Sequence, residues 1–439
     1  MELLDLSDEF LLEIGRHMPA SELKGLMRTC RRLYYLYVTL VWKNISLCPP
    51  RMLPEHALEE HALEHPGTSL PQDIISPAIN PNITTTNAVD KFLTTLLEKA
   101  PSARALASLE TLEFGPRYFF ERPESLKALR MLSRAKVPNL KQIQVNLGCD
   151  RYKVSKGAKN ELRKSTIELM NQAMFVIHEM LYRCKAELAI QSCYPMNFES
   201  TFSSAVICES LRELGLTFYD SVQSHSELAT ALSKCVNLKI LNIKTYNGQM
   251  DGRLPVLHYY QGPLRGLKKL EQLGIASGSI LNNYHPIHLP PNLKTLSLTI
   301  TPYYGPNPLL WSRILGREFS CLESFYFAHS FAQEEFSDIS IEEVQVSTLQ
   351  KISLARTPVS LELFTRILKA NPKLRAVEIK PDIEFIKATL ENCPNLKLIS
   401  GGKNVALPSA EVLRENLTQE QLQKYASVIK RNIPTKHLS

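Results

Sequence analysis

The sequence holds few residues whose types and spacing suit chemistry, and His61 and His65 form the clearest pair. They lie four residues apart in "PEHALEEHALEH", so on a helix they would share one face, a spacing that suits two imidazole ligands of a metal ion. No cysteine or third clear ligand lies close by in the sequence. A solvated helix rich in Glu and His is therefore the favoured interpretation, and neither a metal nor another cofactor is predicted.

The nine cysteines do not indicate redox chemistry, because their number is odd and no C-x-x-C pair exists. Cys208, Cys235 and Cys393 each lie three residues before a leucine of the repeat described below, which predicts small buried apolar side chains at one structural position. The sequence also lacks G-x-x-x-x-G-K-[ST], G-x-S-x-G and H-E-x-x-H motifs. We therefore expect a non-catalytic protein, and a cytosolic enzyme is the least favoured alternative.

Composition narrows the partners and the compartment. The net charge of +7 comes from 51 basic and 44 acidic residues that are well mixed, so no nucleic-acid partner is expected. No apolar run approaches 18 residues, so no membrane span is expected. The N-terminus carries Glu2, Asp5, Asp8 and Glu9 where a signal peptide needs positive charge. These features predict an intracellular protein of the cytoplasm, the nucleus or both.

A recurring L-x-x-L-x-L pattern, with apolar residues at each L, predicts the scaffold. It starts at Leu211, Leu238, Leu270, Leu293, Leu322, Leu349, Leu374 and Leu396, in steps of 22 to 32 residues. This core and period are typical of leucine-rich repeats. Each repeat predicts a short strand, and helical spacing often precedes it, as at Leu361, Phe364, Ile367 and Leu368. The expected fold class is therefore α/β, a solenoid with one curved parallel sheet lined by helices.

The solenoid is predicted to cover residues 106–402, with earlier pattern matches at Leu109 and Leu140. An irregular helical unit near 150–205 interrupts the spacing and is interpreted as an enlarged repeat with one long helix; an inserted helical hairpin is the alternative. Residues 48–105 are rich in proline at their start and are interpreted as a linker and entry to the solenoid. Residues 403–439 are expected to form a C-terminal helical cap or tail, or else a segment that crosses the concave face.

Residues 1–47 do not follow the repeat and predict three short amphipathic helices. They cannot bury much surface by themselves, so either a partner or the end of the solenoid is expected to complete them. The segment resembles an F-box, and it matches that pattern at Leu6, Glu9, Leu11, Ile14, Pro19, Leu23, Leu26, Cys30, Arg31, Arg32, Leu33 and Trp42. It departs from the pattern at Ser7, where proline is usual, at Met18, where leucine is usual, and at Val41 before the tryptophan.

An F-box followed by leucine-rich repeats resembles the substrate adaptors of SCF-type (Skp–cullin–F-box) ubiquitin ligases. The resemblance implies that the F-box binds the Skp-type adaptor and, through it, the cullin and RING subunits, while the repeats hold a protein substrate for ubiquitylation. By this resemblance the adaptor-binding residues are Leu6, Glu9, Leu11, Ile14, Pro19, Leu23, Leu26, Cys30, Leu33 and Trp42. The alternatives are an F-box scaffold subunit that works with the adaptor outside ubiquitylation, and a plain repeat scaffold whose N-terminal helices only cap the stack.

The substrate-binding face is predicted from strand alternation. Side chains at the third, fifth and seventh positions of each motif should face the concave side, and they are mainly small and polar. Aromatic residues gather instead in and just after the strands, and tyrosine is favoured at binding hot spots. The candidates are Lys244, Tyr246, Tyr303, Tyr304, Trp311 and Tyr326. The alternative is that these rings pack over the edges of the repeats.

Overall fold

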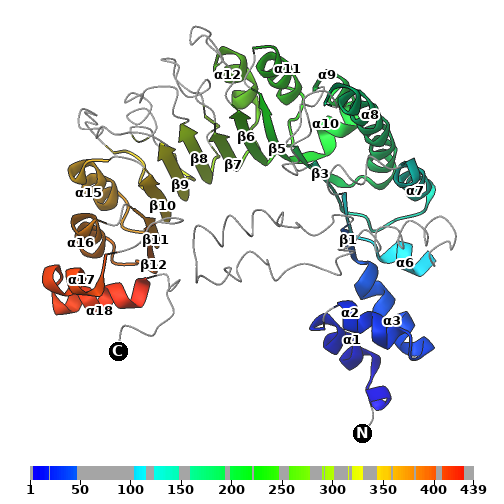
Figure 1. Ribbon diagram of the computed structural model, residues 1–439, viewed down its shortest axis with the longest axis horizontal. Helices are drawn as coiled ribbons and strands as arrows, with labels where there is room; N and C mark the ends of the chain where they lie inside the picture. The colour runs from blue at the N-terminus through cyan, green and yellow to red at the C-terminus, as the bar shows by residue number, and fades with distance from the viewer. Residues whose placement is uncertain are drawn as a thin grey trace. The chain divides into compact units, whose positions relative to one another are not determined.

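The computed structural model (Figure 1) describes the chain in segments. They are residues 3–18, 20–46, 103–114, 123–147, 159–192, 198–219, 222–246, 257–276, 289–290, 292–300, 315, 319–329, 344–356, 359–379, 382–401 and 408–429. The chain divides into two compact units, Met1–Glu213 and Leu214–Ser439. Within the described residues, no helix combines the length and the apolar character needed to cross a lipid bilayer.

The first unit begins with short helices and a strand: η1 (Leu3–Asp5), α1 (Asp8–Arg16), α2 (Ala20–Met27), α3 (Arg31–Trp42) and β1 (Asn44–Ser46). Asp8 and Glu9 stand in the first turn of α1, where carboxylates interact favourably with the helix dipole. Cys30 is extended, and its sulfur accepts a hydrogen bond from Leu33 N at 3.5 Å, which caps α3. Only Lys43 separates α3 from β1, so the helices lead directly into the sheet.

The rest of the first unit alternates helices with strands. Its elements are α6 (Ala103–Ser108), β2 (Thr111–Phe114), α7 (Pro123–Arg134), β3 (Gln142–Leu147), α8 (Lys159–Cys184), β4 (Glu187–Ser192), α9 (Phe198–Thr201) and α10 (Ala205–Ser210). Strands β1 to β4 are parallel and neighbour one another in sequence order. Helix α8 lies in the chain between the adjacent strands β3 and β4, as expected for an enlarged repeat, and residues 148–158 lie outside the described segments. The sheet begins at β1, before the predicted linker, and residues 47–102 lie outside the described segments.

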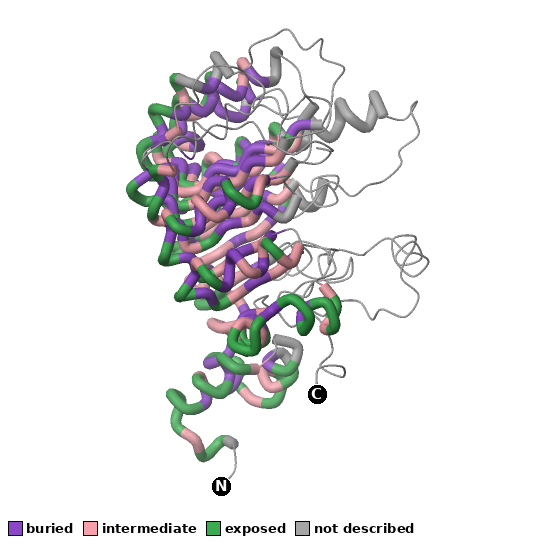
Figure 2. The backbone as a smooth tube through the Cα atoms, turned by 90° about the vertical axis from the view of Figure 1, so that its left-hand side faces the viewer, coloured by how far each residue is buried: buried purple, intermediate pink, exposed green. Residues whose placement is uncertain are grey.

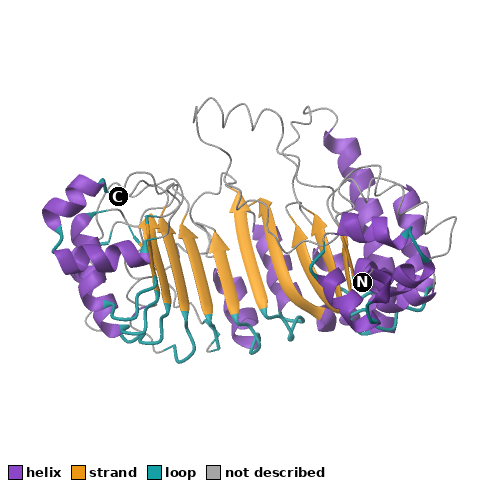
Figure 3. Ribbon diagram, turned by 90° about the horizontal axis from the view of Figure 1, so that it is seen from below, coloured by secondary structure: helices purple, strands orange, loops and turns teal. Residues whose placement is uncertain are grey.

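The second unit continues the series of strands after β5 (Leu211–Tyr219), which crosses the boundary between the units, and described helices stand between some of them. It contains α11 (Val222–Leu232), β6 (Ile240–Tyr246), α12 (Leu257–Gly266), β7 (Gln272–Ala276), β8 (Thr295–Ile300), β9 (Ser324–His329), β10 (Lys351–Arg356), α15 (Leu361–Ala370), β11 (Ala376–Glu378), α16 (Ile383–Asn392), β12 (Leu398–Ser400), α17 (Ala410–Asn416) and α18 (Gln419–Val428). Strands β6 to β12 are parallel and ordered as in the sequence, and Figure 3 shows them side by side. Helices α11, α12, α15 and α16 lie on one side of these strands (Figure 1).

Burial follows the leucine pattern closely. In the repeat that starts at Leu238, the first, fourth and sixth positions, Leu238, Leu241 and Ile243, are at most 3% exposed. Asn242 and Lys244, between and after them, are exposed. Figure 2 shows buried and half-buried residues alternating along the strands. The predicted α/β fold with a parallel sheet and helices is therefore confirmed, and it is consistent with a leucine-rich-repeat solenoid.

Asparagine side chains join successive repeats just before the first leucine of the pattern. Asn139 Nδ2 donates to Ala107 O at 2.6 Å, Asn292 Nδ2 to Lys268 O at 2.9 Å, and Asn395 Nδ2 to Pro372 O at 3.2 Å. Each bond satisfies a carbonyl two residues before the first leucine of the preceding repeat. In all three places the asparagine begins the sequence Asn-Leu-Lys. The spacing of apolar residues along the strands does not by itself reveal this contact.

Asn371 has a stronger version of this role because it is fully buried. Its Oδ1 accepts from Leu349 N at 3.0 Å, and its Nδ2 donates to Val346 O and Ile367 O, each at 2.9 Å. The side chain thus connects the end of α15 to the start of β10 in the preceding repeat. A buried amide with all these partners fixes the register of two repeats.

Charged residues alternate in sign just before the strands. Glu110 lies between Lys43 Nζ at 3.4 Å and Lys141 Nζ at 2.9 Å, and Glu271 pairs with Lys294 at 2.9 Å. The hydrogen bond from Lys141 is the main cause that holds the pKa of Glu110 below its ordinary value. A register slip of one residue would separate these opposite charges, so the pairs favour the observed alignment.

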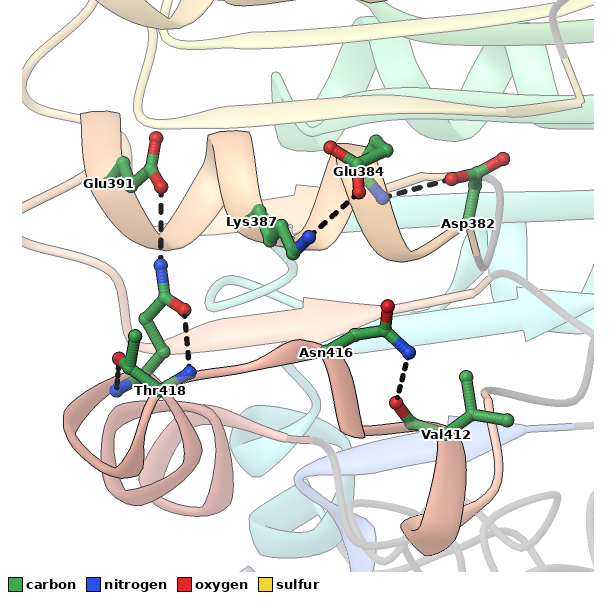
Figure 4. Close-up of polar contacts among 8 residues, drawn as sticks. Asp382, Glu384, Lys387, Glu391, Val412, Asn416 and Thr418 are labelled. Carbon is green, nitrogen blue, oxygen red and sulfur yellow. Dashed lines mark hydrogen bonds and ion pairs between the residues drawn. The ribbon is translucent and has the colours of Figure 1, made fainter. Parts of the chain in front are cut away.

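The last helices lie against the final repeat (Figure 4). Thr418 and Gln421 form a capping box at the start of α18, and Gln421 Nε2 donates to Glu391 of α16 at 3.2 Å. Helix α18 packs on α16 and β12, and Ile429 forms a parallel bridge with Ile399 of β12. The outer edge of the last strand is therefore partly paired.

Candidate functional site

The residues that the F-box resemblance singles out separate into a core and a surface. Leu11, Leu23 and Leu33 are 0%, 4% and 2% exposed, and they form one hydrophobic cluster with residues of α3. These three side chains hold the helices together and are closed to a partner. Their predicted role in binding is therefore restricted to positioning the surface around them.

The accessible part of the predicted set is smaller. Leu6, Leu26, Cys30 and Trp42 are half-buried, and they pack against the same cluster from outside. Ile14 is 38% exposed, and Glu9 on the same helix is also exposed. Pro19 lies outside the described residues. An apolar surface on the three helices is thus available for contact.

Phe10 is the most exposed large apolar residue described in these helices, and the F-box pattern does not include it. Its side chain is 67% exposed and lies four residues before Ile14, so the two occupy neighbouring positions on one flank of α1. The i, i+4 spacing of two large apolar residues on an otherwise amphipathic helix is the signal that marks this flank. We call Phe10 and Ile14 the α1 flank.

Arg32 positions this flank by joining α3 to the start of the chain. Its Nε donates to Asp8 Oδ1 at 2.9 Å, while Nη1 and Nη2 donate to the carbonyls of Leu4 and Leu6 at 2.5 and 2.7 Å. The planar guanidinium thereby orders the turn that precedes α1. Arg32 was matched to the F-box pattern, but its function as a clamp was not foreseen.

Close packing of α1 on α3 depends on Gly15. A Cβ atom at Gly15 would lie 2.6 Å from Cε1 of Tyr37, which is fully buried. The Tyr37 hydroxyl makes no hydrogen bond within the described part of the chain, and burial raises its pKa. The ring is therefore held in this place by packing.

Two carboxylates lie near the α1 flank, Glu9 and Glu13, and Glu13 is paired with Arg16 at 2.7 Å. The pKa of Glu9 is lowered first by a hydrogen bond to its own backbone N–H and then by Ser7. Hydrogen bonds from Arg16 and His17 lower the pKa of Glu13, so both carboxylates are ionised at neutral pH. An exposed apolar pair with acidic neighbours can bind a protein surface that combines an apolar pocket with basic groups.

The remaining candidates for chemistry do not gather into a site. Within the described segments, no three His, Cys, Asp or Glu side chains come together to hold a metal. Cys208, Cys235 and Cys393 are all at most 2% exposed, which confirms them as buried apolar side chains. Burial raises the pKa of Cys393 to about 11, so its thiol remains protonated. His61 and His65 lie outside the described residues.

The predicted substrate residues lie far apart where the structure describes them. Lys244 is exposed on β6 and Tyr326 is half-buried on β9, three strands away, or about 14 Å at ordinary strand spacing. Tyr246 ends β6, but its side chain is not among those described. Tyr303, Tyr304 and Trp311 also fall outside the described residues. The six candidates therefore remain a prediction.

Small side chains surround Tyr326 on the open face of the sheet. Its neighbours in register are Ser297 on β8 and Ser353 on β10. Farther along the same row, a Cβ at Gly274 would meet Oδ1 of Asn242 at 2.3 Å, so this glycine leaves room for the amide. The face offers a broad polar surface with one aromatic ring, and no pocket for catalysis is evident from these residues.

Comparisons with known proteins do not identify a function for this site. No family model and no curated protein match this sequence. Among solved structures, the chain is similar to "Crystal structure of Rad7 and Elc1 complex in yeast", with 16% identity and a TM-score of 0.43 over 72% of this chain and 76% of that chain. At this identity and TM-score, the similarity carries no argument about what this chain does.

Proposed function

We propose that this protein is the substrate-recognition subunit of an SCF-type ubiquitin ligase. The proposal starts from the F-box resemblance of residues 1–47, which are followed by repeats of the leucine-rich type. The observation that carries it furthest is the α1 flank, because Phe10 is 67% exposed and Ile14 38% exposed on helices that already have their own core. Large apolar side chains left open in this way favour a protein partner.

In this proposal the three helices bind the Skp-type adaptor by apolar burial. Covering a phenylalanine side chain contributes about 2 kcal/mol, and an aromatic residue at the centre of an interface often dominates binding. Glu9 adds a negative charge that would favour a basic group on the adaptor. The core residues Leu11, Leu23 and Leu33 contribute by keeping the helices in place.

The repeats then hold a protein substrate, and the cullin and RING subunits bring the ubiquitin-loaded enzyme. In this scheme the chain itself does not catalyse the transfer of ubiquitin. It acts by raising the effective concentration of the substrate near that enzyme. The broad polar face of β6 to β12 suits recognition of a protein surface better than binding of a small molecule.

The test is co-purification of the full-length protein with the Skp-type adaptor and a cullin. The informative variant is Phe10→Ala with Ile14→Ala, because both side chains are exposed and their loss leaves the core intact. Val412→Ala on α17, where the valine is 40% exposed, is the matched control. Leu23→Ala is unsuitable because Leu23 is 4% exposed, and its truncation would destabilise the helices.

Each outcome separates one reading from the others. Recovery of adaptor and cullin, lost in the double variant and kept in the control, supports the ligase subunit. Recovery of the adaptor without cullin favours an F-box scaffold outside ubiquitylation. Recovery of neither by folded wild-type protein contradicts both and leaves a repeat scaffold whose N-terminal helices cap the stack.

A further inference from the structure

Large apolar side chains are also exposed on helices α7 and α8 of the first unit. On α8, Phe175 is 65% exposed and Tyr182 is 62% exposed, and on α7 Met131 is 38% exposed. Helices α7 and α8 pack side by side (Figure 1). Between them, Arg183 Nη1 donates to Ser133 O at 2.8 Å. Side chains of both helices can therefore contribute to one surface.

This surface carries a strong excess of positive charge. Among the described side chains of α7, α8 and the turns that follow them, six are cationic and one, Glu179, is a carboxylate. The cations are Lys127, Arg130, Arg134, Lys136, Arg183 and Lys185. The first four are exposed and form no salt bridge within the described part of the chain. Because these four side chains are exposed, a partner can reach them, although the chain as a whole is only mildly basic.

Lys185 stands out because of its backbone. It has φ 55°, the left-handed conformation in which glycine or asparagine is favoured, just after the end of α8. Its Nζ lies 4.9 Å from the centre of the Tyr182 ring. A lysine at this position is a less stable choice than glycine, and it brings a cation to the edge of the aromatic patch.

We propose that the α7–α8 face, formed by Lys127, Arg130, Arg134, Phe175, Tyr182 and Lys185, binds an acidic, amphipathic segment of a partner protein. Charge complementarity identifies the acidic character of the partner. Phe175 and Tyr182 are seven residues apart, about 10 Å along α8, which matches apolar side chains two turns apart on a partner helix. The aromatic residues supply the apolar contact, and the cations fix orientation.

A single-stranded nucleic acid also seeks basic surfaces with aromatic rings, but these rings suit it less well. Bases stack on open ring faces. The ammonium of Lys185 already lies over the Tyr182 ring, and the Phe175 and His178 rings lie 6.4 Å apart with an interplanar angle of 32°. With neighbours on these rings, side-chain packing from a protein is favoured over base stacking.

The test uses full-length protein and three fluorescein-labelled probes. The first is a synthetic acidic helical peptide with leucines seven residues apart, the second is the same peptide with every Glu replaced by Gln, and the third is a 20-nucleotide oligothymidine. Fluorescence anisotropy is measured at low and high salt. We expect the acidic peptide to bind most tightly and to weaken at least several-fold at high salt, since exposed charges are screened.

Two variants examine the face directly. Phe175→Ala with Tyr182→Ala should weaken binding of the acidic peptide at least tenfold. Lys185→Asn should weaken it several-fold while leaving thermal stability unchanged or higher, because asparagine tolerates a positive φ better than lysine does. The matched control combines Val236→Ala with Lys234→Asn, which removes an exposed apolar residue and an exposed cation from another helix end.

Three results would overturn the inference: no binding of the acidic peptide by folded protein, equal weakening in the control, or tighter binding of oligothymidine. The inference does not rest on the proposed function, because the α1 flank and the α7–α8 face share no residue. Co-purification of the α7–α8 variants with the Skp-type adaptor should therefore be unchanged.

Discussion

The three N-terminal helices and the repeats of the second unit bury their apolar side chains in different ways. In the repeats, each strand buries its leucines against neighbouring repeats, and the open face carries mainly small polar side chains. In the helices, one small cluster around Leu11 and Tyr37 is closed, whereas Phe10 and Ile14 remain exposed. Among the described residues, the strands of the repeats bury their leucines within the chain, whereas the helices leave apolar surface that a partner can cover.

The largest expected effect concerns the repeats. Asn371→Ala removes a buried amide and leaves Leu349 N–H and the carbonyls of Val346 and Ile367 without their partner. We expect a loss of about 3 kcal/mol in the free energy of unfolding, measured with urea. Asn395→Ala is the control, because Asn395 is exposed and makes one bond of 3.2 Å, and it should cost less than about 1 kcal/mol. Equal losses would show that the buried amide does not join the repeats.

The next prediction concerns the packing of α1 on α3. Gly15→Ala forces a methyl group against the Tyr37 ring and should destabilise the three helices by about 1–2 kcal/mol. Gly25→Ala on α2 is the control, because no atom lies within 4 Å of the added carbon and helix propensity improves. Hydrogen exchange of α1 and α3 distinguishes the two. Unchanged protection in Gly15→Ala would mean that the helices tolerate the methyl group by moving apart.

Arg32 provides a smaller test of the same helices. Arg32→Ala removes its bonds to Leu4 O, Leu6 O and Asp8, so the first turn should lose protection from hydrogen exchange. The expected cost is about 1 kcal/mol, as for a charged hydrogen-bonding group that is partly exposed. The neighbouring exposed Arg31→Ala should leave protection unchanged. Adaptor affinity should fall more in Arg32→Ala than in Arg31→Ala if the clamp positions the α1 flank.

The smallest effect concerns the charge pairs at the start of the strands. The pKa of Glu110 is lowered in the folded protein, mainly by the hydrogen bond from Lys141, so its contribution to stability is present above the unfolded pKa of about 4.3. That contribution is lost as the pH falls through the lower, folded pKa. Glu110→Gln should therefore cost about 0.5 kcal/mol at pH 7 and nothing near pH 2. A constant difference between pH 7 and pH 2 would contradict the charge pairing.

Much of the fold could be predicted because leucine spacing reports burial directly. The apolar positions after Leu238 and Leu293 point inward as the alternation predicted, and the position of Cys393 indicated a buried thiol. The Asn-Leu-Lys contacts could also have been found, because asparagine precedes the first leucine in several repeats. Strand periodicity misses them because it ignores polar residues.

The candidate site could be predicted only in part. A family pattern weights Leu11 and Leu23, whose burial keeps the helices folded, and it passes over Phe10, whose exposure depends on which flank of α1 faces solvent. The hydrogen bonds of Arg32 and the left-handed backbone of Lys185 depend on residues distant in sequence or on local backbone geometry. Such features can be identified only in the folded structure.

The central claim is that the three helices bind a Skp-type adaptor through the α1 flank. Isothermal titration of the adaptor into purified full-length protein tests it most directly, with Phe10→Ala/Ile14→Ala and Val412→Ala as the paired variants. The account predicts that the double variant binds at least tenfold more weakly than wild type, with unchanged thermal unfolding, while Val412→Ala binds like wild type. Equal affinity of all three proteins, or no heat of binding from folded wild type, would contradict it.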